Sequence, residues 1–402
     1  MREGLKKVTE DRYGSRNVLG MGLISLMNDV ASEMIYPLLP IFLTGVLSAG
    51  VASIGIIEGI AETTTSLLKY LSGFYSDRLR KRKPVFAAGY AISNLFRPLI
   101  GISTGWLHVL LFRFSDRVGK GIRTAPRDAL LSDSVSPGNL GLAFGFQRTM
   151  DHIGALAGPL IATALISFGL SIRTVFLLTI IPGAVTVIMA LSMVRERTHI
   201  GSERVPRISI GSIKKPGFLW YLLSVSVFTL GNSTDAFLLL KAHDAGISVV
   251  MIPVLWAMLH LSKAVFSMPG GRLSDRLGRK PVIILGWVVY ALVYGGFALA
   301  GSVTAVWLLF LSYGLYFGLT EGVEKAFVAE LIPAEARGSA YGAYSLAVSI
   351  TALPASVIFG LVWQEFGNQA AFALGAGLAL TASIMLLFVR NQRPGLSGQG
   401  NN

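Results

Sequence analysis

The chain has 402 residues, of which 52% are hydrophobic and only 14% are charged, and its mean hydropathy is +0.61. A soluble domain carries about 25% charged residues, so this composition excludes a water-soluble globule and indicates an integral membrane protein. The formal net charge of +13 would suggest nucleic-acid binding in a soluble protein, but here the positions of the basic residues matter more than their number.

Twelve segments are long and apolar enough to cross a bilayer, since a spanning helix needs about 20 mostly apolar residues. The predicted spans cover residues 18–45, 51–75, 84–103, 105–131, 140–167, 172–194, 217–242, 247–272, 281–301, 304–330, 337–364 and 369–390. We therefore predict an all-α membrane protein with two pseudo-symmetric six-helix bundles. The predicted parts are an N-terminal bundle (1–194), a cytoplasmic linker (195–216), a C-terminal bundle (217–390) and a disordered tail (391–402).

Basic residues alternate with the spans. They gather before the first span, in two turns after spans 2 and 8, in the linker and after Arg390, whereas the other short loops hold almost none apart from Arg173. An excess of Lys and Arg in alternate short loops marks the cytoplasmic side. Both termini and the linker are thus predicted to be cytoplasmic, and nucleic acid is not expected as a partner.

One basic turn occurs twice. Gly73, Asp77 and Arg78 return as Gly271, Asp275 and Arg276, and a second pair of matching segments, 129–145 and 326–342, has nearly the same offset of about 197 residues. Two matches at one offset indicate parallel repeats of six spans each.

The turns also suggest a device that holds one conformation closed. A carboxylate there can lie near a helix N-terminus, and the arginines can bind carboxylates at the end of span 4. The alternative is that these charges only set the topology, and both can hold. The predicted conformational latch comprises Gly73, Asp77, Arg78, Asp128, Asp133, Gly271, Asp275, Arg276, Arg279 and Glu330.

The repeated turn resembles the signature of the major facilitator superfamily between spans 2 and 3, of the form G-x-L-x-D-R-x-G-R-K. The second copy fits closely, whereas the first has Tyr75 for the leucine and Arg80 for the glycine. Span 4 resembles an R-x-x-Q-G motif, with Lys120 in place of glutamine, and span 5 is similar to an antiporter G-x-x-x-G-P motif at Gly154, Gly158 and Pro159. The resemblance implies the twelve-helix fold of that superfamily and points to its bacterial drug:proton antiporter branch, in the cytoplasmic (inner) membrane.

Span 4 carries a stripe of charges at spacings of three and four, which places most of them on one helix face. The stripe comprises Arg113, Asp116, Arg117, Lys120, Arg123, Arg127 and Asp128. Each unpaired charge at the bilayer centre costs about 2.5–3.5 kcal/mol, so the stripe is predicted to face a wet cavity or to pair with other spans. Alternatively, its end from Arg123 onward lies at the cytoplasmic interface with extended side chains.

Ionisable groups in other spans are candidate partners, because such groups inside a membrane are functional by default. The predicted proton-coupling residues are Asp29, Glu33, Arg117 and Asp151, with a carboxylate of span 1 alternately paired with Arg117 and released. A static buried ion pair is the alternative. The predicted substrate cavity comprises Asn28, Glu58, Glu62, Arg97, Arg113, Asp116, Lys120, Arg148, His152, Asn232, Asp235, Glu321, Glu324 and Lys325.

These features and the resemblance predict a secondary transporter, not an enzyme. It is expected to export small organic compounds in a proton-coupled, antiporter-like manner by rocking-bundle alternating access. No phosphate-binding G-x-x-x-x-G-K-[ST] loop occurs, which argues against ATP-driven transport. The alternatives are a transporter of organic anions, siderophores or metal ions in either direction, and a channel or receptor on the same fold. The expected partners are a small-molecule substrate, protons and the lipid bilayer; a monomer without cofactor or metal is expected.

Overall fold

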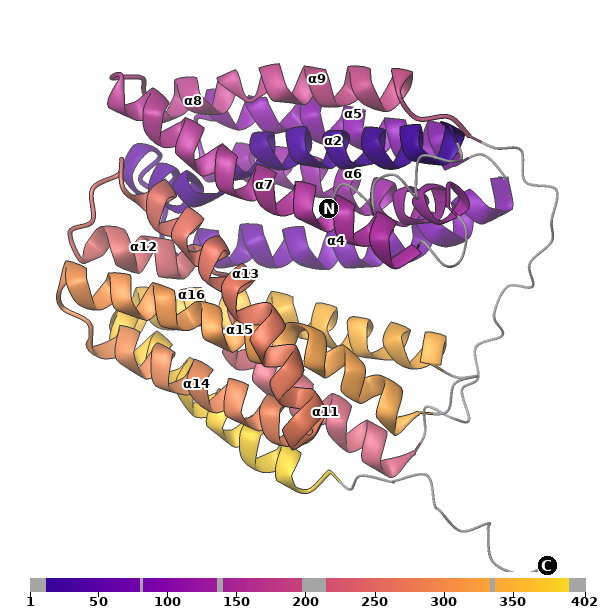
Figure 1. Ribbon diagram of the computed structural model, residues 1–402. Coiled ribbons are helices and arrows are strands. Elements are labelled where there is room, and N and C mark those ends of the chain that lie inside the picture. The colour runs from indigo at the N-terminus through magenta and orange to yellow at the C-terminus, as the bar shows by residue number, and fades with distance from the viewer. Residues whose placement is uncertain (1–11, 80–81, 136–139, 197–214, 333–336, 390–402) are drawn as a thin grey trace, which may run out of the picture. The chain divides into compact units, whose positions relative to one another are not determined.

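The computed structural model describes residues 12–79, 82–135, 140–196, 215–332 and 337–389, and every element in these ranges is a helix (Figure 1). Most of the predicted linker and the whole predicted tail lie outside the described residues. The surroundings of Gly73 and the side chains of Asp77 and Arg78 also lie outside the described part of the chain. Contacts divide the chain into two compact units.

Unit 1 contains most of the N-terminal half together with Thr234–Leu261. Within it, α5 packs closely on α6, α4 on α6, and α2 on α7 and α9 (Figure 1). Its elements are α2 (Arg12–Glu33), η1 (Tyr36–Leu38), α3 (Leu39–Ile41), η2 (Phe42–Val46), α4 (Ala52–Leu79), α5 (Arg82–Leu99), η3 (Ile100–Ile102), α6 (Trp106–Asp133), α7 (Leu140–Ser167), α8 (Ile172–Leu178), α9 (Ile180–Ser192), α12 (Ala236–Asp244) and the start of α13 (Ile252–Leu277).

Unit 2 contains α11 (Pro216–Gly231), α13 from Ser262 onward, α14 (Arg279–Leu299), most of α15 (Val303–Leu331), and α16 (Arg337–Leu387). Here α16 packs on both α11 and α14. The assignment of Thr234–Leu261 to unit 1 differs from the predicted bundle boundary at the linker, which follows the sequence repeat and stays a prediction.

The predicted spans have helical counterparts. Gly367 has a φ of 86° inside α16, which divides that element into two helices at the predicted loop 364–370. By length and apolarity, nine candidate spans are found in the described ranges, with α16 counted once. The helices α4 and α6 are not among them, because their charged residues interrupt the apolar windows.

Several predicted spans are not single α-helices; span 6, for example, is divided at Thr179 between α8 and α9. Span 7 breaks between α11 and α12 at residues 232–235, where Asn232 has φ −97° and ψ 80°. Span 1 changes from α2 to short 3-10, α and π turns at Tyr36, where Pro37 and Pro40 cannot donate the usual backbone hydrogen bonds.

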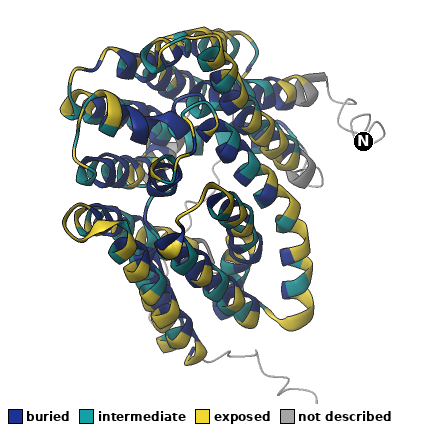
Figure 2. Cartoon of the chain, turned by 90° about the vertical axis from the view of Figure 1, so that its left-hand side faces the viewer, coloured by how far each residue is buried: buried dark blue, intermediate teal, exposed yellow. Residues whose placement is uncertain are grey.

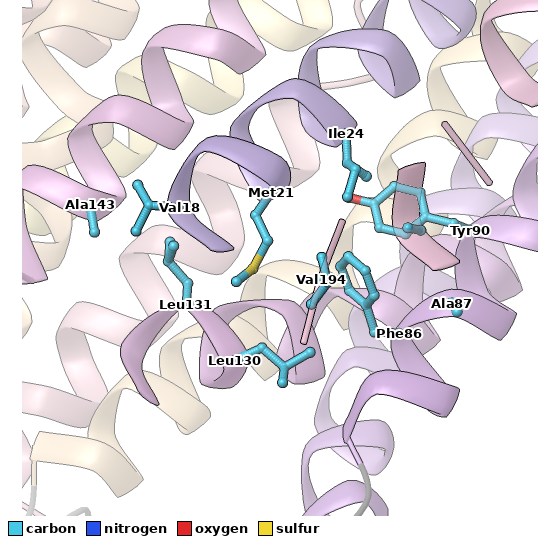
Figure 3. Packing of buried hydrophobic residues seen from close by; sticks show 11 residues of the cluster. Val18, Met21, Ile24, Phe86, Ala87, Tyr90, Leu130, Leu131, Ala143 and Val194 are labelled. Carbon is cyan, nitrogen blue, oxygen red and sulfur yellow. The ribbon is translucent and has the colours of Figure 1, made fainter. Parts of the chain in front are cut away.

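The apolar core of unit 1 lies where α2, α5, α6, α7 and α9 converge. Met21 and Ile24 of α2 contact a cluster that includes Phe86, Tyr90 and Leu131 (Figure 3). Along the helices of both units, buried and exposed residues alternate by face (Figure 2). Many of the exposed side chains are large and apolar, as a helix surface in contact with hydrocarbon requires.

Candidate functional site

The charged stripe of α6 lies inside unit 1. Arg113, Asp116, Arg117 and Arg123 are all buried, and Lys120 is half-buried. The cost of exposing these charges to lipid predicts this arrangement, and the geometry agrees with it. The stripe meets α5 along a closely packed contact, where a Cβ on Gly119 would lie 2.5 Å from the Gly89 carbonyl oxygen.

Arg113 forms the best-aligned ion pair of the cluster with Glu58 of α4. Its Nε lies 2.8 Å from Glu58 Oε1 and its Nη2 lies 3.1 Å from Oε2, so the guanidinium binds both oxygens. Arg113 is 1% exposed and Glu58 7%. A two-point pair of this kind fixes orientation as well as charge, and it ties α4 to α6.

Asp116 is the centre of a second group of contacts. Its Oδ1 accepts a hydrogen bond from Arg97 Nη2 of α5 at 2.9 Å, and its Oδ2 lies 3.5 Å from Arg113 Nη1. Arg97 also donates to the Asn94 side chain at 3.0 Å and to the Asn28 backbone oxygen at 3.2 Å. One carboxylate thus connects α6 with α5 and, through Arg97, with α2.

Arg123 is buried between α5 and α6. Its Nη1 donates to Ser93 Oγ at 2.7 Å, its guanidinium carbon lies 4.4 Å from the centre of the Tyr90 ring, and it is 5% exposed. Beyond it, Arg127 and Asp128 are half-buried and pair with each other at 3.0 Å. The buried part of the stripe therefore ends at Arg123, and the interfacial alternative for the residues from Arg123 onward stays open.

Arg117 differs from Arg97, Arg113 and Arg123 in having no side-chain hydrogen bond among the described residues. Its closest carboxylate oxygen in the described chain is Asp116 Oδ2, at 3.9 Å, and its Nε has no hydrogen-bond partner. Lys120 and Arg123 add positive charge nearby. In the buried part of the cluster, four arginines face only two carboxylates, Glu58 and Asp116.

Asp29 and Glu33 lie on α2 and are half-buried. Asp29 accepts a hydrogen bond from Asn28 Nδ2 at 3.0 Å, and Glu33 accepts one from Trp256 Nε1 at 2.7 Å. Neither carboxylate forms an ion pair with an arginine in the described ranges. The predicted pairing with Arg117 is therefore absent from this conformation, and the predicted alternation stays a prediction.

The antiporter-type motif of α7 packs directly against these two carboxylates. A Cβ on Gly154 would lie 2.5 Å from the Leu26 carbonyl oxygen and 3.0 Å from Asp29 Cβ, and one on Gly158 would lie 2.7 Å from the Val30 carbonyl oxygen and 3.0 Å from Glu33 Cβ. Small residues of this kind let two membrane helices approach closely. The two glycines therefore set the position of α2 where its carboxylates lie.

Replacing Gly154 or Gly158 with alanine is expected to separate α2 from α7 and to destabilise the protein by about 1–3 kcal/mol, the usual cost of overpacking. Unfolding of the purified protein in detergent measures this loss. Gly145→Ala is the matched control, since it lies on α7 with no atom within 4 Å of a new Cβ. Equal stability of all three variants would contradict the close-packing role.

The other predicted residues differ in burial, and two of them act on the stripe, Glu62 on Lys120 and Asp151 on Arg127. In unit 1, Asp151 is half-buried and interacts electrostatically with Asp29, whereas Glu62, Arg148 and His152 are exposed. Of the C-terminal candidates, Asn232 donates to the Tyr316 hydroxyl at 3.2 Å within unit 2, and Asp235 belongs to unit 1. Glu321 and Lys325 are exposed, whereas Glu324 is half-buried in α15.

Two predicted latch carboxylates, Asp133 and Glu330, form equivalent ion pairs in the two halves. Arg82 binds Asp133 in unit 1, and Arg279 lies 3.3 Å from Glu330 in unit 2, at the repeat offset of about 197 residues. Asp128 pairs instead with its neighbour Arg127, and Asp275 and Arg276 are exposed. The carboxylates at the end of span 4 and its repeat thus bind basic residues from the duplicated turns.

The lysines that follow make a second duplicated contact. Lys83 Nζ donates to the Leu191 carbonyl oxygen at 2.8 Å, and Lys280 Nζ donates to that of Leu387 at 2.6 Å. Between the turn and α14, Gly278 has a φ of 89°, a conformation that favours glycine. Each turn therefore binds two later helices of its own half.

Replacing Arg82 and Arg279 together with glutamine is expected to change stability by less than about 1 kcal/mol, because both pairs are partly exposed. If the pairs act as a latch, the populations of the transport conformations will shift about fivefold, as 1 kcal/mol allows. Distance measurements between spin labels on the two halves test this. Arg272→Gln, which changes an exposed arginine of the same region, should leave the populations unchanged. If the double variant also leaves the populations unchanged, the charges of the turns set only the topology and the latch hypothesis is wrong.

Several residues that contact the predicted ones were not themselves predicted, among them Arg82, Ser93, Asn94 and Trp256. Asn94 lies one turn before Arg97 in an apolar helix, so the spacing could have indicated a shared polar face. Trp256 is 223 residues from Glu33, and nothing in the sequence marks that contact.

Comparison with known proteins agrees with this architecture. A family model described as Major Facilitator Superfamily matches residues 21–261 and 236–401. An uncharacterized MFS-type transporter of Methanocaldococcus jannaschii is 37% identical over 396 residues, covering 96% of this chain and 98% of that protein. The multi-drug resistance efflux pump PmrA of Streptococcus pneumoniae is 32% identical over 133 residues, which cover 32% of this chain and 33% of the pump.

Among solved structures, the nucleoside transporter NupG superposes with a TM-score of 0.78 at 15% identity, over 92% of this chain and 98% of that chain. At this identity the likeness shows the fold alone. The family model and the archaeal relative both extend over nearly the whole length. The chain therefore belongs to the Major Facilitator Superfamily and is a multi-pass transport protein of that family.

Proposed function

We propose that this protein is a secondary active transporter that couples export of a small organic compound to proton movement by rocking-bundle alternating access. Its expected location is the bacterial cytoplasmic membrane, with both termini cytoplasmic. The observation that carries the proposal is the pair Asp29 and Glu33, which lie beside a buried cluster of arginines without forming an ion pair with any of them in the described ranges.

Two carboxylates one helical turn apart repel each other when both are charged. Binding of one proton relieves that repulsion, and movement of Arg117 toward the pair would release the proton again. The glycines of α7 hold the two carboxylates at a helix contact, so a change in the packing of α2 on α7 would alter their surroundings. The short match to an efflux pump supports the direction of export.

A second candidate follows from the excess of positive charge. Four buried arginines face two buried carboxylates, and Arg117 Nε has no hydrogen-bond partner in the described chain. A substrate carboxylate or phosphate would supply the missing acceptor. This observation favours an organic anion as the transported compound.

Transport into proteoliposomes under an imposed pH gradient tests both candidates. Cationic dyes and anionic metabolites are offered separately, and an ionophore that removes the gradient is the control. Movement of either class that requires the gradient supports proton coupling, and the class that moves decides between the candidates. Transport at the same rate and to the same extent with and without the gradient would overturn the proposal.

A further inference from the structure

The interior of unit 2 differs from that of unit 1 at equivalent positions. At the repeat offset of about 197 residues, Arg97 and Asp116 correspond to Tyr294 and Tyr313. These tyrosines are buried, with their ring centres 6.1 Å apart. An ionic cluster in one half is thus replaced by an aromatic cluster in the other.

One carboxylate lies beside aromatic residues of unit 2. Glu324 of α15 occupies the position that Arg127 has in the first half. Its Oε1 accepts a hydrogen bond from Trp287 Nε1 of α14 at 2.9 Å, and its Oε2 accepts one from the Tyr344 hydroxyl of α16 at 2.6 Å. The Tyr221 hydroxyl of α11 donates to its backbone oxygen at 3.2 Å. Both carboxylate oxygens are therefore held by neutral donors from neighbouring helices.

No ion pair to Glu324 exists in the described ranges. The charged side chains that act on it are Lys325 and Glu321 of its own helix, both exposed, which attract and repel it respectively. The titratable groups that face it are the phenols of Tyr221 from α11 and Tyr344 from α16.

The other basic groups of the surrounding helices have different partners. Lys263 of α13 lies 3.5 Å from the centre of the Phe317 ring, and Arg279 of α14 binds Glu330. The charge on the Glu324 carboxylate is therefore stabilised by hydrogen bonds and not by a paired cation.

Such a carboxylate is balanced between two forms. Removal from water favours the protonated form, whereas hydrogen bonds donated to the oxygens favour the charged form. The Tyr344 contact of 2.6 Å has the length of an O–H···O⁻ hydrogen bond.

We propose that Glu324 is a proton-binding site of unit 2, separate from the acidic residues of α2. Its deprotonated carboxylate binds α14 through Trp287 and α16 through Tyr344. A proton taken up from water joins one carboxylate oxygen, which weakens these charge-assisted hydrogen bonds by roughly half. Loss of the proton to water restores them, so the packing of α15 against α14 and α16 depends on protonation. The site does not depend on the coupling role of Asp29 and Glu33.

Infrared difference spectra of the full-length protein, recorded while pH is changed in lipid nanodiscs, test the proposal. A protonated carboxyl band is expected, and Glu324→Gln should remove it. Tyr344→Phe removes one donor to the charged form and should raise the midpoint of the band by about one to two pH units. Tyr341→Phe, an exposed tyrosine one turn earlier on α16, should leave the midpoint unchanged.

Two further results decide the matter. The band should persist in Asp29→Asn with Glu33→Gln, which separates this site from the coupling proposed for unit 1. A band that Glu324→Gln leaves intact would overturn the assignment. If Glu324→Gln does not fold, a midpoint unmoved by Tyr344→Phe would overturn it equally. A carboxyl band that changes with sodium concentration at fixed pH, but does not change with pH, would indicate a cation site and would also contradict the proposal.

Discussion

Replacing Asp116 with asparagine is expected to destabilise the protein by about 3–5 kcal/mol, the cost of breaking a buried ion pair by removing one partner. Asparagine keeps the shape of the side chain but removes the charge that faces Arg97 at 2.9 Å and Arg113 at 3.5 Å. Arg97 would then lose its carboxylate partner, and Glu58 alone would face both Arg113 and Arg117. Denaturant unfolding of the purified protein in detergent measures the effect.

Asp128→Asn is the matched control for this substitution. It makes the same chemical change on the same helix, but Asp128 is half-buried and pairs only with its neighbour Arg127 among the described side chains. A partly exposed pair between adjacent residues contributes about 1 kcal/mol. Equal losses of stability in the two variants would show that the Asp116 contacts do not carry the energy assigned to them.

The second large effect is expected on transport. Asp29→Asn combined with Glu33→Gln removes both carboxylates of α2 that lie beside the arginine cluster, so a proton can no longer be bound there. One proton crossing 100 mV supplies about 2.3 kcal/mol, which supports a substrate gradient of about fiftyfold. The double variant is expected to equilibrate its substrate without accumulating it.

Substrate accumulation in proteoliposomes at a fixed proton-motive force measures this effect. Asp244→Asn is the control, because it removes a carboxylate from unit 1 at the end of α12, away from the cluster. It should accumulate substrate as the unmodified protein does. Full accumulation by the double variant would mean that coupling uses other groups.

Much of the fold follows from the sequence because its determinants are local or repeated. Apolar length predicts the spans, and the offset of about 197 residues anticipates the equivalent pairs of Arg82 with Asp133 and Arg279 with Glu330. The membrane cost of charge predicts that α6 turns Arg113 inward. In each case the sequence of one helix, or of one repeat, is enough to make the prediction.

The pairing inside the cluster could not be read in the same way. The closest basic partner of Asp116 is Arg97, at 2.9 Å, and that contact is set by where α5 packs against α6. The contact of Glu33 with Trp256 and the helix break after Gly231 depend on packing between distant segments. Periodicity within a single span carries no signal for such contacts.

The asymmetry between the halves was predicted only in part. Charges crowd into the first half of the sequence, which suggests that coupling is concentrated there. The structure adds that Glu324 in the second half is held by Trp287 and Tyr344 against an aromatic cluster. Aromatic residues in a membrane helix look like ordinary apolar packing in the sequence, so their role as hydrogen-bond donors became visible only with the fold.

Proton movement during transport is the most direct test of the central claim. A pH-sensitive dye enclosed in proteoliposomes records whether addition of a transported compound moves protons across the membrane. Export coupled to protons predicts proton flow opposite to the substrate, present in the unmodified protein and lost in Asp29→Asn with Glu33→Gln. Substrate movement with no accompanying proton flow in the unmodified protein would contradict the account.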